Sequence, residues 1–137
     1  MRPMMMTLAA AMLALLPEAV LAAPPTGTPT GIWTNPQKSV RVVFQKCGRA
    51  MCGKIVWASP KAQSDAERGG GGPLVGTMLF SDFVEQRRGL WNGSVLIPDI
   101  GQTVTGTIEQ TGPDTLVGEG CLLAGFGCKR QTWTRTR

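Results

Sequence analysis

The stretch VRVVFQKCGRAMCGKIVW, from Val40 to Trp57, sets two segments rich in β-branched and aromatic residues on either side of a short glycine-containing turn. Such segments favour β-strands, and so short a turn joins them into an antiparallel hairpin. Cys47 and Cys52 stand at the two ends of the turn. The stretch therefore predicts a hairpin closed by a disulfide, a feature typical of small exported domains.

Side chains alternate between the two faces of a strand, so the pairing of this hairpin predicts which of them point inward. If Cys47 lies opposite Cys52, then Val42 lies opposite Trp57, and Phe44 shares the face of that apolar pair. The cystine falls on the other face, among polar side chains. We expect the hairpin to form one wall of a β-structure, with the cystine outside and the large apolar side chains inside.

Comparable short segments, bounded by Gly, Pro, Asn or Asp, recur along the rest of the chain. Strands are predicted at residues 31–34, 40–45, 54–57, 74–80, 90–97, 103–110, 115–121 and 129–135. Residues 58–73 are expected to form a polar loop, because consecutive glycines oppose a helix there, and residues 80–89 are left unassigned. One antiparallel meander that closes on itself pairs every strand edge, so we predict a single all-β barrel of about eight strands.

A second hairpin can be paired around a Pro-Asp-Ile-Gly turn, whose residues are favourable at these turn positions. This pairing sets Trp91 opposite Ile108 on one face. It also sets Gly93 opposite Gly106. Facing glycines indicate a sharp bend or a close approach of the backbone at this place in the sheet.

An even number of cysteines follows residue 22, namely Cys47, Cys52, Cys121 and Cys128. Three pairings are formally open, and we favour the one in which each cystine brackets a short turn. Cys121 opposite Cys128 sets Leu116 beside Trp133, and this cystine again falls on the polar face. A four-thiolate zinc site is the alternative, but structural zinc usually uses C-x2-C spacing, and the spacings here are C-x4-C and C-x6-C. No metal and no cofactor is predicted.

The first 22 residues have the features of a cleaved signal peptide. Arg2 precedes an apolar run from Met4 to Leu16, and a small-x-Ala sequence ends at Ala22. The alternative, a transmembrane anchor, needs about 20 apolar residues, more than the run supplies. We expect a signal peptide at 1–22, a disordered Pro/Thr/Gly leader at 23–30 and the barrel domain at 31–137, in a periplasmic or secreted protein.

Removing this signal peptide takes away one basic and one acidic residue, so the net charge stays at +5. The basic residues are dispersed and form no run, and we therefore predict no nucleic-acid partner. A weak contact with an anionic envelope surface stays open. The sequence does not indicate an oligomeric state.

The chain has few side chains of the kinds that usually act in catalysis. It has no histidine and, if both cystines form, no free thiol, which excludes Ser-His and Cys-His mechanisms. The carboxylates that a different mechanism could use are Asp65, Glu67, Asp82, Glu85 and Asp99. Asp99 has a turn role and the others lie in polar segments, so we interpret them as solvated charges and predict no enzyme.

Short motifs spread over the chain resemble an exported bacterial family, domain of unknown function 2147. They are Gly31 to Trp33, Cys47 to Trp57, Asp65-Ala66, Leu74 to Thr77, Trp91 to Gly93, Ile97 to Asp99 with Gly101, and Gly120 to Arg135. The resemblance implies a lipocalin-like barrel in the periplasm and brings no settled activity. In such barrels an arginine from the last strand covers a Gly-x-Trp on the first, positions that Gly31, Trp33 and Arg135 match, which implies a structural closure.

An eight-stranded barrel can just hold one small ligand, so binding of a small hydrophobic or amphipathic molecule is the leading functional hypothesis. The candidate lining residues are Phe44, Trp57, Phe80, Trp91 and Trp133. Alternatively, these rings simply fill the barrel. The protein would then be an envelope structural or stress-linked protein that acts through its basic outer surface.

Overall fold

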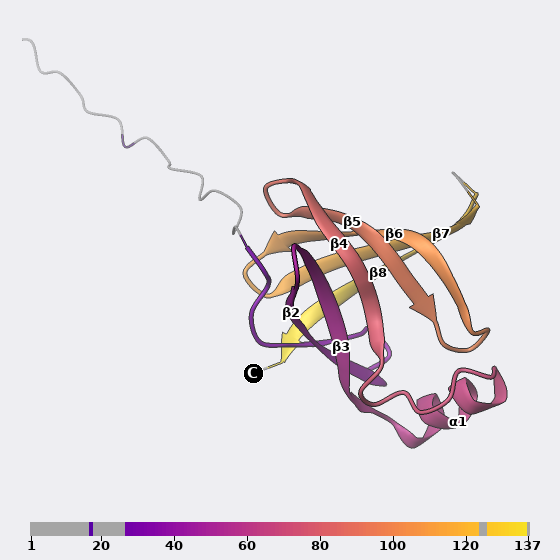
Figure 1. Cartoon of the computed structure of the whole chain (residues 1–137). Coiled ribbons are helices and arrows are strands. Elements are labelled where there is room, and N and C mark those ends of the chain that lie inside the picture. The colour runs from indigo at the N-terminus through magenta and orange to yellow at the C-terminus, as the bar shows by residue number, and fades with distance from the viewer. Residues whose placement is uncertain (1–16, 18–26, 124–125, 137) are drawn as a thin grey trace, which may run out of the picture.

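In the computed structural model, residues 17, 27–123 and 126–136 are described, and within them eight antiparallel strands close into a barrel (Figure 1). The strands are β1 (Ile32–Thr34), β2 (Val40–Cys47), β3 (Ala50–Ala58), β4 (Met78–Arg87), β5 (Leu90–Ile97), β6 (Gln102–Gly112), β7 (Thr115–Leu123) and β8 (Phe126–Thr136). Each strand pairs with the next, and β1 also pairs with β8. The predicted closed meander is confirmed.

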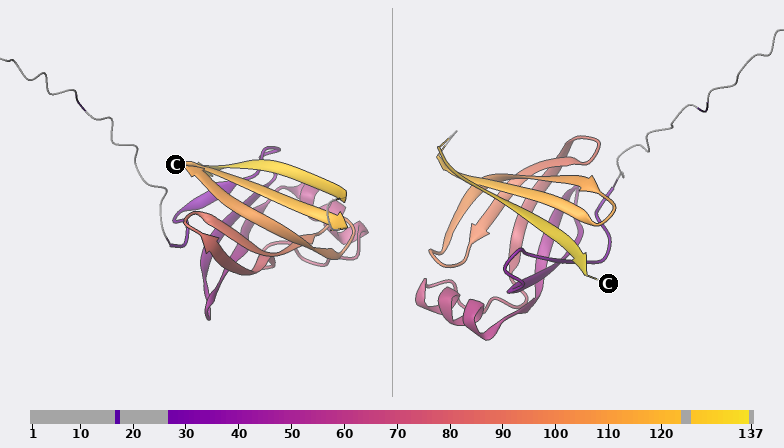
Figure 2. Two further views of the ribbon diagram at one scale, coloured as in Figure 1. Left: turned by 90° about the horizontal axis from the view of Figure 1, so that it is seen from above. Right: turned by 180° about the vertical axis from the view of Figure 1, so that it is seen from behind.

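Because successive strands run in opposite directions, their connections gather at two ends of the barrel. We call one the closed end; it holds the β2–β3, β4–β5 and β6–β7 turns. The other, the rim end, holds the β1–β2 loop (35–39), the segment 59–77 with helix α1 (Pro60–Arg68), the β5–β6 turn and the tip of the β7–β8 hairpin. Figure 2 shows α1 and this hairpin tip on the same side of the barrel in both views.

The first hairpin forms as predicted, but its pairing differs by two residues. Cys47 lies opposite Ala50, and a two-residue turn that begins at Gly48 (φ 66°) joins the strands. Glycine supplies the positive φ that such tight turns require. A shift of two keeps the alternation, so Val42 and Ile55 are both buried. Cys47 still bonds to Cys52, so the predicted cystine is confirmed. The expectation that it lies on the outside holds for Cys47, which is exposed, but not for Cys52, which is buried.

Trp57 was expected inside the barrel, and this prediction is wrong. The pairing of β2 and β3 is interrupted between Arg41 and Val42, and Trp57 lies opposite Arg41. A β-bulge adds one residue to a strand and reverses the alternation beyond it. Trp57 is accordingly 39% exposed, and the guanidinium carbon of Arg41 lies 4.8 Å from its ring centroid.

The pairings predicted for the two later hairpins are confirmed. Trp91 lies opposite Ile108, and Gly93 lies opposite Gly106. A Cβ on Gly106 would come within 2.7 Å of the Glu119 carbonyl oxygen, so the backbone does approach closely at these glycines. In the last hairpin Leu116 lies opposite Trp133, and the disulfide between Cys121 and Cys128 is present.

The segment predicted as a polar loop contains the helix α1, so the prediction for 58–73 is corrected. The Ser59 hydroxyl accepts a hydrogen bond from the Ala62 N–H at 3.1 Å, and Pro60 occupies the first turn. Both are strong signals for a helix start. The glycines that opposed a helix lie beyond its last residue, where they end it instead of interrupting it.

The unassigned segment 80–89 belongs mostly to β4, which starts later than the predicted strand at 74–80. Asp82 has a positive φ of 57°, and the pairing with β5 is interrupted between Ser81 and Val84. This irregularity resets the alternation, so Phe80 and Phe83 are both buried although they are three residues apart.

The expected signal peptide, apart from Pro17, lies outside the described residues, as does most of the expected leader. Within the leader's described part, Pro29 is buried and Thr30 accepts a hydrogen bond from the Trp33 indole at 3.1 Å. No helix among the described residues is long and apolar enough to span a membrane.

Candidate functional site

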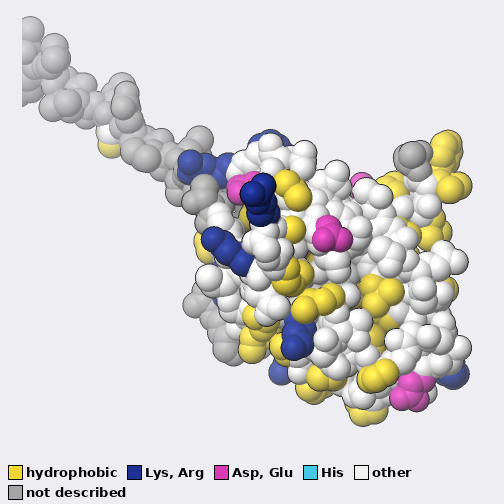
Figure 3. All heavy atoms as spheres, in the orientation of Figure 1, with side chains coloured by type: hydrophobic (Ala, Val, Ile, Leu, Met, Phe, Trp, Pro, Cys, Tyr) yellow, Lys and Arg dark blue, Asp and Glu magenta, His cyan; other side chains and the backbone are white. Residues whose placement is uncertain are grey.

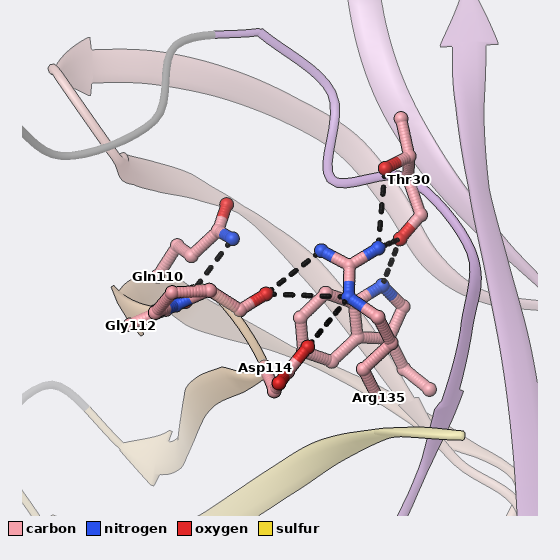
Figure 4. Close-up of polar contacts among 7 residues, drawn as sticks. Thr30, Gln110, Gly112, Asp114 and Arg135 are labelled. Carbon is pink, nitrogen blue, oxygen red and sulfur yellow. Dashed lines mark hydrogen bonds and ion pairs between the residues drawn. The ribbon is translucent and has the colours of Figure 1, made fainter. Parts of the chain in front are cut away.

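The closed end is shut by Arg135, which lies over the ring of Trp33. Its guanidinium carbon is 4.6 Å from the ring centroid, and Trp33 is completely buried. The same guanidinium bonds to Thr30 on one side and contacts Asp114 on the other (Figure 4), with 3.2 Å between Arg135 Nε and Asp114 Oδ1. It also donates to the Pro113 carbonyl oxygen at 2.8 Å. A cation over an aromatic ring, with its donors satisfied by fixed acceptors, makes a well-defined plug.

A cluster of four aromatic rings lies across the interior above this plug. Phe80 is its centre: its ring centroid is 5.5 Å from Phe44, 5.8 Å from Phe83 and 5.6 Å from Trp133. These separations and angles are those of favourable ring pairs. The cluster separates a filled half of the barrel, which holds Trp91, from a hollow half.

The hollow half is a cavity of about 620 Å³ that reaches the rim end. Its deep wall is apolar and includes Ile55, Leu79, Phe80, Val95, Val104 and Trp133. Gly118 and Gly120 also line it, because they share the inward face of β7 with the buried Leu116. The absence of side chains at these two positions leaves room for a guest molecule.

Helix α1 connects two sides of the rim. Where it begins, the Ser59 N–H donates to the Ser39 carbonyl oxygen of the β1–β2 loop at 2.8 Å. Where it ends, a Cβ on Gly69 would come within 2.1 Å of the Asp99 carbonyl oxygen in the β5–β6 turn. Only glycine allows this contact, so the residue after α1 fixes the helix against the far side of the rim.

Asn35 orders the β1–β2 loop at the rim. Its buried side-chain oxygen accepts hydrogen bonds from the Ser39 N–H at 2.8 Å and the Val40 N–H at 2.9 Å. Its amide group donates to Gln37 and to the Ser39 hydroxyl. These side-chain hydrogen bonds satisfy backbone N–H groups that no neighbouring strand pairs with in the loop. Asn35 and Lys38 of this loop both line the cavity.

Charged groups surround the mouth of the cavity. Asp65 bonds to Lys61 at 2.7 Å and to Arg68, and these hydrogen bonds, that to Lys61 first, hold the pKa of the Asp65 carboxyl below its usual value. Lys38 and Lys129 also line the cavity, and among the described residues neither forms an ion pair. Asp99 of the β5–β6 turn and Glu119 of β7 add one carboxylate each.

The five predicted lining residues thus fall in three places. Phe80 and Trp133 line the cavity. Phe44 and Trp91 are buried but do not line it, and Trp57 lies on the outer wall. Sequence reasoning missed Asn35, whose position before Pro36 in a loop was a weak signal, and the small residues of β7 that create the space.

The carboxylates considered for catalysis do not converge. Asp65 and Asp99 line the cavity. Glu67 is exposed on α1 without lining it, and Asp82 and Glu85 are exposed on β4. Both cystines occupy the thiols that a four-thiolate metal site would need. The absence of an enzymatic activity stays a prediction.

An eight-stranded meander with a plugged end and an apolar cavity at the other end defines the lipocalin-like class of barrels. The family model described as "Uncharacterized protein conserved in bacteria (DUF2147)" matches residues 31–135, and the chain belongs to this family. Its fold is similar to a solved structure, "Protein HP1028 from the human pathogen Helicobacter pylori belongs to the lipocalin family", with a TM-score of 0.59, 16% identity and coverage of 82% of this chain and 85% of that one. No curated protein matches the chain significantly.

Proposed function

We propose that the protein binds a small hydrophobic or amphipathic molecule, with the apolar part of the ligand in the barrel and any polar group at the rim. The observation that carries this proposal is the cavity of about 620 Å³. Its volume falls within the roughly 300–1,000 Å³ of typical ligand pockets. A barrel whose interior was filled with side chains would favour an action through the outer surface instead.

The distribution of polar groups supports an amphipathic ligand. The apolar wall ends in the aromatic rings of Phe80 and Trp133, and the charged groups stand at the mouth. Lys38 and Lys129 can each meet an anionic headgroup, since no carboxylate of the described residues engages them. Among the cavity-lining carboxylates, Asp65 is paired with Lys61 and Arg68, and Glu119 lies opposite Arg130. Asp99 alone then stands against the two lysines, so a long-chain carboxylate fits the site better than an amine of the same chain length.

The place of action that we propose is the periplasm or another exported compartment. The features of a signal peptide in residues 1–22 support export. The two cystines support it as well, because disulfides form and persist in oxidising compartments.

Gly118→Val tests the cavity directly. A Cβ at Gly118 would meet no atom closer than 3.7 Å, so the variant should fold, and its methyl groups would project into the cavity. A β-branched residue also suits a strand. Calorimetric titration with a saturated fatty acid, the matching alcohol and the matching amine should show binding by the wild type, tightest for the acid, and loss of binding by the variant.

Val117→Ile is the matched control, because Val117 precedes Gly118 on β7 and, by alternation, points outward. It should bind as the wild type does. The proposal fails if no member of the panel binds the wild type, or if Gly118→Val folds and binds every one of them with unchanged affinity.

A further inference from the structure

The β7–β8 hairpin ends in an exposed apolar tip at the rim end. Leu122, Leu123 and Phe126 are 53%, 70% and 74% exposed, and the last two lie opposite each other. We call these three residues the apolar tip. Figure 3 shows hydrophobic side chains standing clear of the body where this hairpin extends in Figure 1. All three belong to the strands, since β7 ends at Leu123 and β8 begins at Phe126. Three large apolar side chains exposed together at one end of a hairpin are unusual on the surface of a small domain and indicate a binding surface.

Basic residues follow the apolar tip immediately. Lys129 and Arg130 are both exposed on β8, with Gly120 and Glu119 as their respective cross-strand neighbours. Lys129 therefore faces no acidic side chain across the sheet, whereas Arg130 faces Glu119. An apolar tip with adjacent cations is suited to the interface of an anionic bilayer, where the apolar groups enter and the cations meet phosphates.

The cystine between Cys121 and Cys128 closes the hairpin directly behind the apolar tip. It holds the two strands together whether or not the tip is covered, so little ordering is required on binding. Two further exposed apolar side chains, Val75 and Ile100, lie at the same end of the barrel, each 49% exposed. A surface that contacts this end would therefore meet more than the hairpin alone.

We infer that the apolar tip inserts into an anionic membrane surface and that Lys129 and Arg130 contact its phosphate groups. A second copy of the chain is a poorer occupant. A stable protein interface buries about 800 Å² on each partner, and a narrow hairpin tip with three large side chains offers no such area. The cavity opens at the same end, so this contact orients the opening of the cavity toward the membrane.

Vesicle sedimentation of the full chain with both cystines formed tests the inference. Wild-type protein should bind vesicles of phosphatidylglycerol and phosphatidylcholine, bind pure phosphatidylcholine more weakly, and lose the difference as salt is raised. The double variant Leu123→Ser with Phe126→Ser should reduce binding by roughly tenfold or more. Lys129→Gln should weaken binding to the mixed vesicles only.

Val84→Ser is the matched control, because Val84 is 52% exposed but lies on β4 toward the closed end. It should bind vesicles as the wild type does. Thermal melting monitored by circular dichroism checks that each variant is folded. Phe126→Trp gives a second measurement: its added fluorescence should shift to shorter wavelength with vesicles and be quenched by brominated lipid.

The inference is overturned if the wild type binds neither kind of vesicle, or if the folded double variant binds like the wild type. It is also overturned if sedimentation velocity shows a dimer that the double variant dissociates, because a second copy would then cover the tip. Ligand binding is a separate question: Gly118→Val should still bind vesicles, and the double variant should still bind a fatty acid in solution.

Discussion

The closed end and the rim end of the barrel are built from the same strands but differ in what their connections carry. At the closed end, the β6–β7 turn and the segment before β1 supply backbone acceptors to the guanidinium of Arg135, which packs over Trp33. At the rim end, the connections are longer and carry a helix, cations and exposed apolar side chains. The difference indicates that the closed end contributes most to stability, which is consistent with the proposed binding of a ligand at the rim end.

The largest effect that this comparison predicts is at Trp33. Trp33→Ala removes a completely buried ring together with its hydrogen bond to Thr30, and it should lower the free energy of unfolding by about 3–5 kcal/mol. Ile100 lies at the rim end and its side chain is half-exposed, so Ile100→Ala should change the free energy of unfolding by less than about 0.5 kcal/mol. Urea unfolding measures both. Equal losses for the two variants would contradict the assignment of stability to the closed end.

The next effect concerns the rim. Gly69→Ala places a Cβ where the Asp99 carbonyl oxygen lies 2.1 Å away, so the end of α1 must move away from the β5–β6 turn. We expect a loss of about 1–3 kcal/mol and a weaker affinity for the fatty acid, because the rim opens. Gly112→Ala, where the nearest atom is 3.9 Å away, should leave both quantities unchanged. If calorimetry gave Gly69→Ala the same affinity for the fatty acid as the wild type, the position of α1 would not matter for ligand binding.

A smaller loss is predicted for Arg135→Lys. Lysine keeps the charge but cannot reach Thr30, Pro113 and Asp114 at once, so about 1–2 kcal/mol should be lost. The matched control is Arg87→Lys. Arg87 pairs with Glu109 at 3.3 Å, but its side chain is 63% exposed, and the change should be under about 0.5 kcal/mol. If both variants unfold at the same urea concentration, the plug does not depend on the shape of the guanidinium.

The smallest effect is a pH dependence at the rim. Lys61 and Arg68 lower the pKa of Asp65 in the folded state, so the folded protein favours the ionised carboxyl. The resulting stabilisation is present above the ordinary carboxyl pKa of about 3.9 and is lost as the pH falls through the lowered value. Asp65→Asn should remove it. Acid titrations of the two proteins, followed by the helical circular dichroism signal, should differ at low salt and converge at high salt.

Much of the fold could be predicted from the sequence because alternation is a local property. The facing pairs Trp91 with Ile108 and Leu116 with Trp133 follow from the turns between them, and the structure has both. Trp57 shows where this reasoning ends. A bulge opposite Arg41 reverses the alternation, and no residue type in that stretch marks the bulge.

Helix α1 was missed for a different reason. The glycine run at 69–72 was counted against a helix, although Ser59 and Pro60 are strong signals for a helix start and the glycines lie past its end. Whether these glycines oppose a helix or end it depends on their position after the helix-start residues and not on how many there are. Phe83 was missed because the sequence left residues 80–89 unassigned: the positive φ of Asp82 and the irregular pairing beside it break the period of two that marks a strand.

The candidate site could be predicted only in part. An inward aromatic residue has the same pattern whether it fills the barrel, as Phe44 does, or lines a cavity, as Trp133 does. A ring lines a cavity only where the barrel interior beside it is empty. Here that empty space exists because Gly118 and Gly120 face it and contribute no side chains. The cavity depends on residues from several strands, so no single segment of the sequence predicts it.

Native mass spectrometry of the protein purified from the cells that naturally produce it tests the central claim most directly. The account predicts a discrete added mass on the wild type that is released on denaturation. The same added mass should be absent from Gly118→Val and present on Val117→Ile. A wild-type protein that carries no added mass, and that binds no fatty acid, alcohol or amine afterwards, would contradict the proposed ligand-binding role.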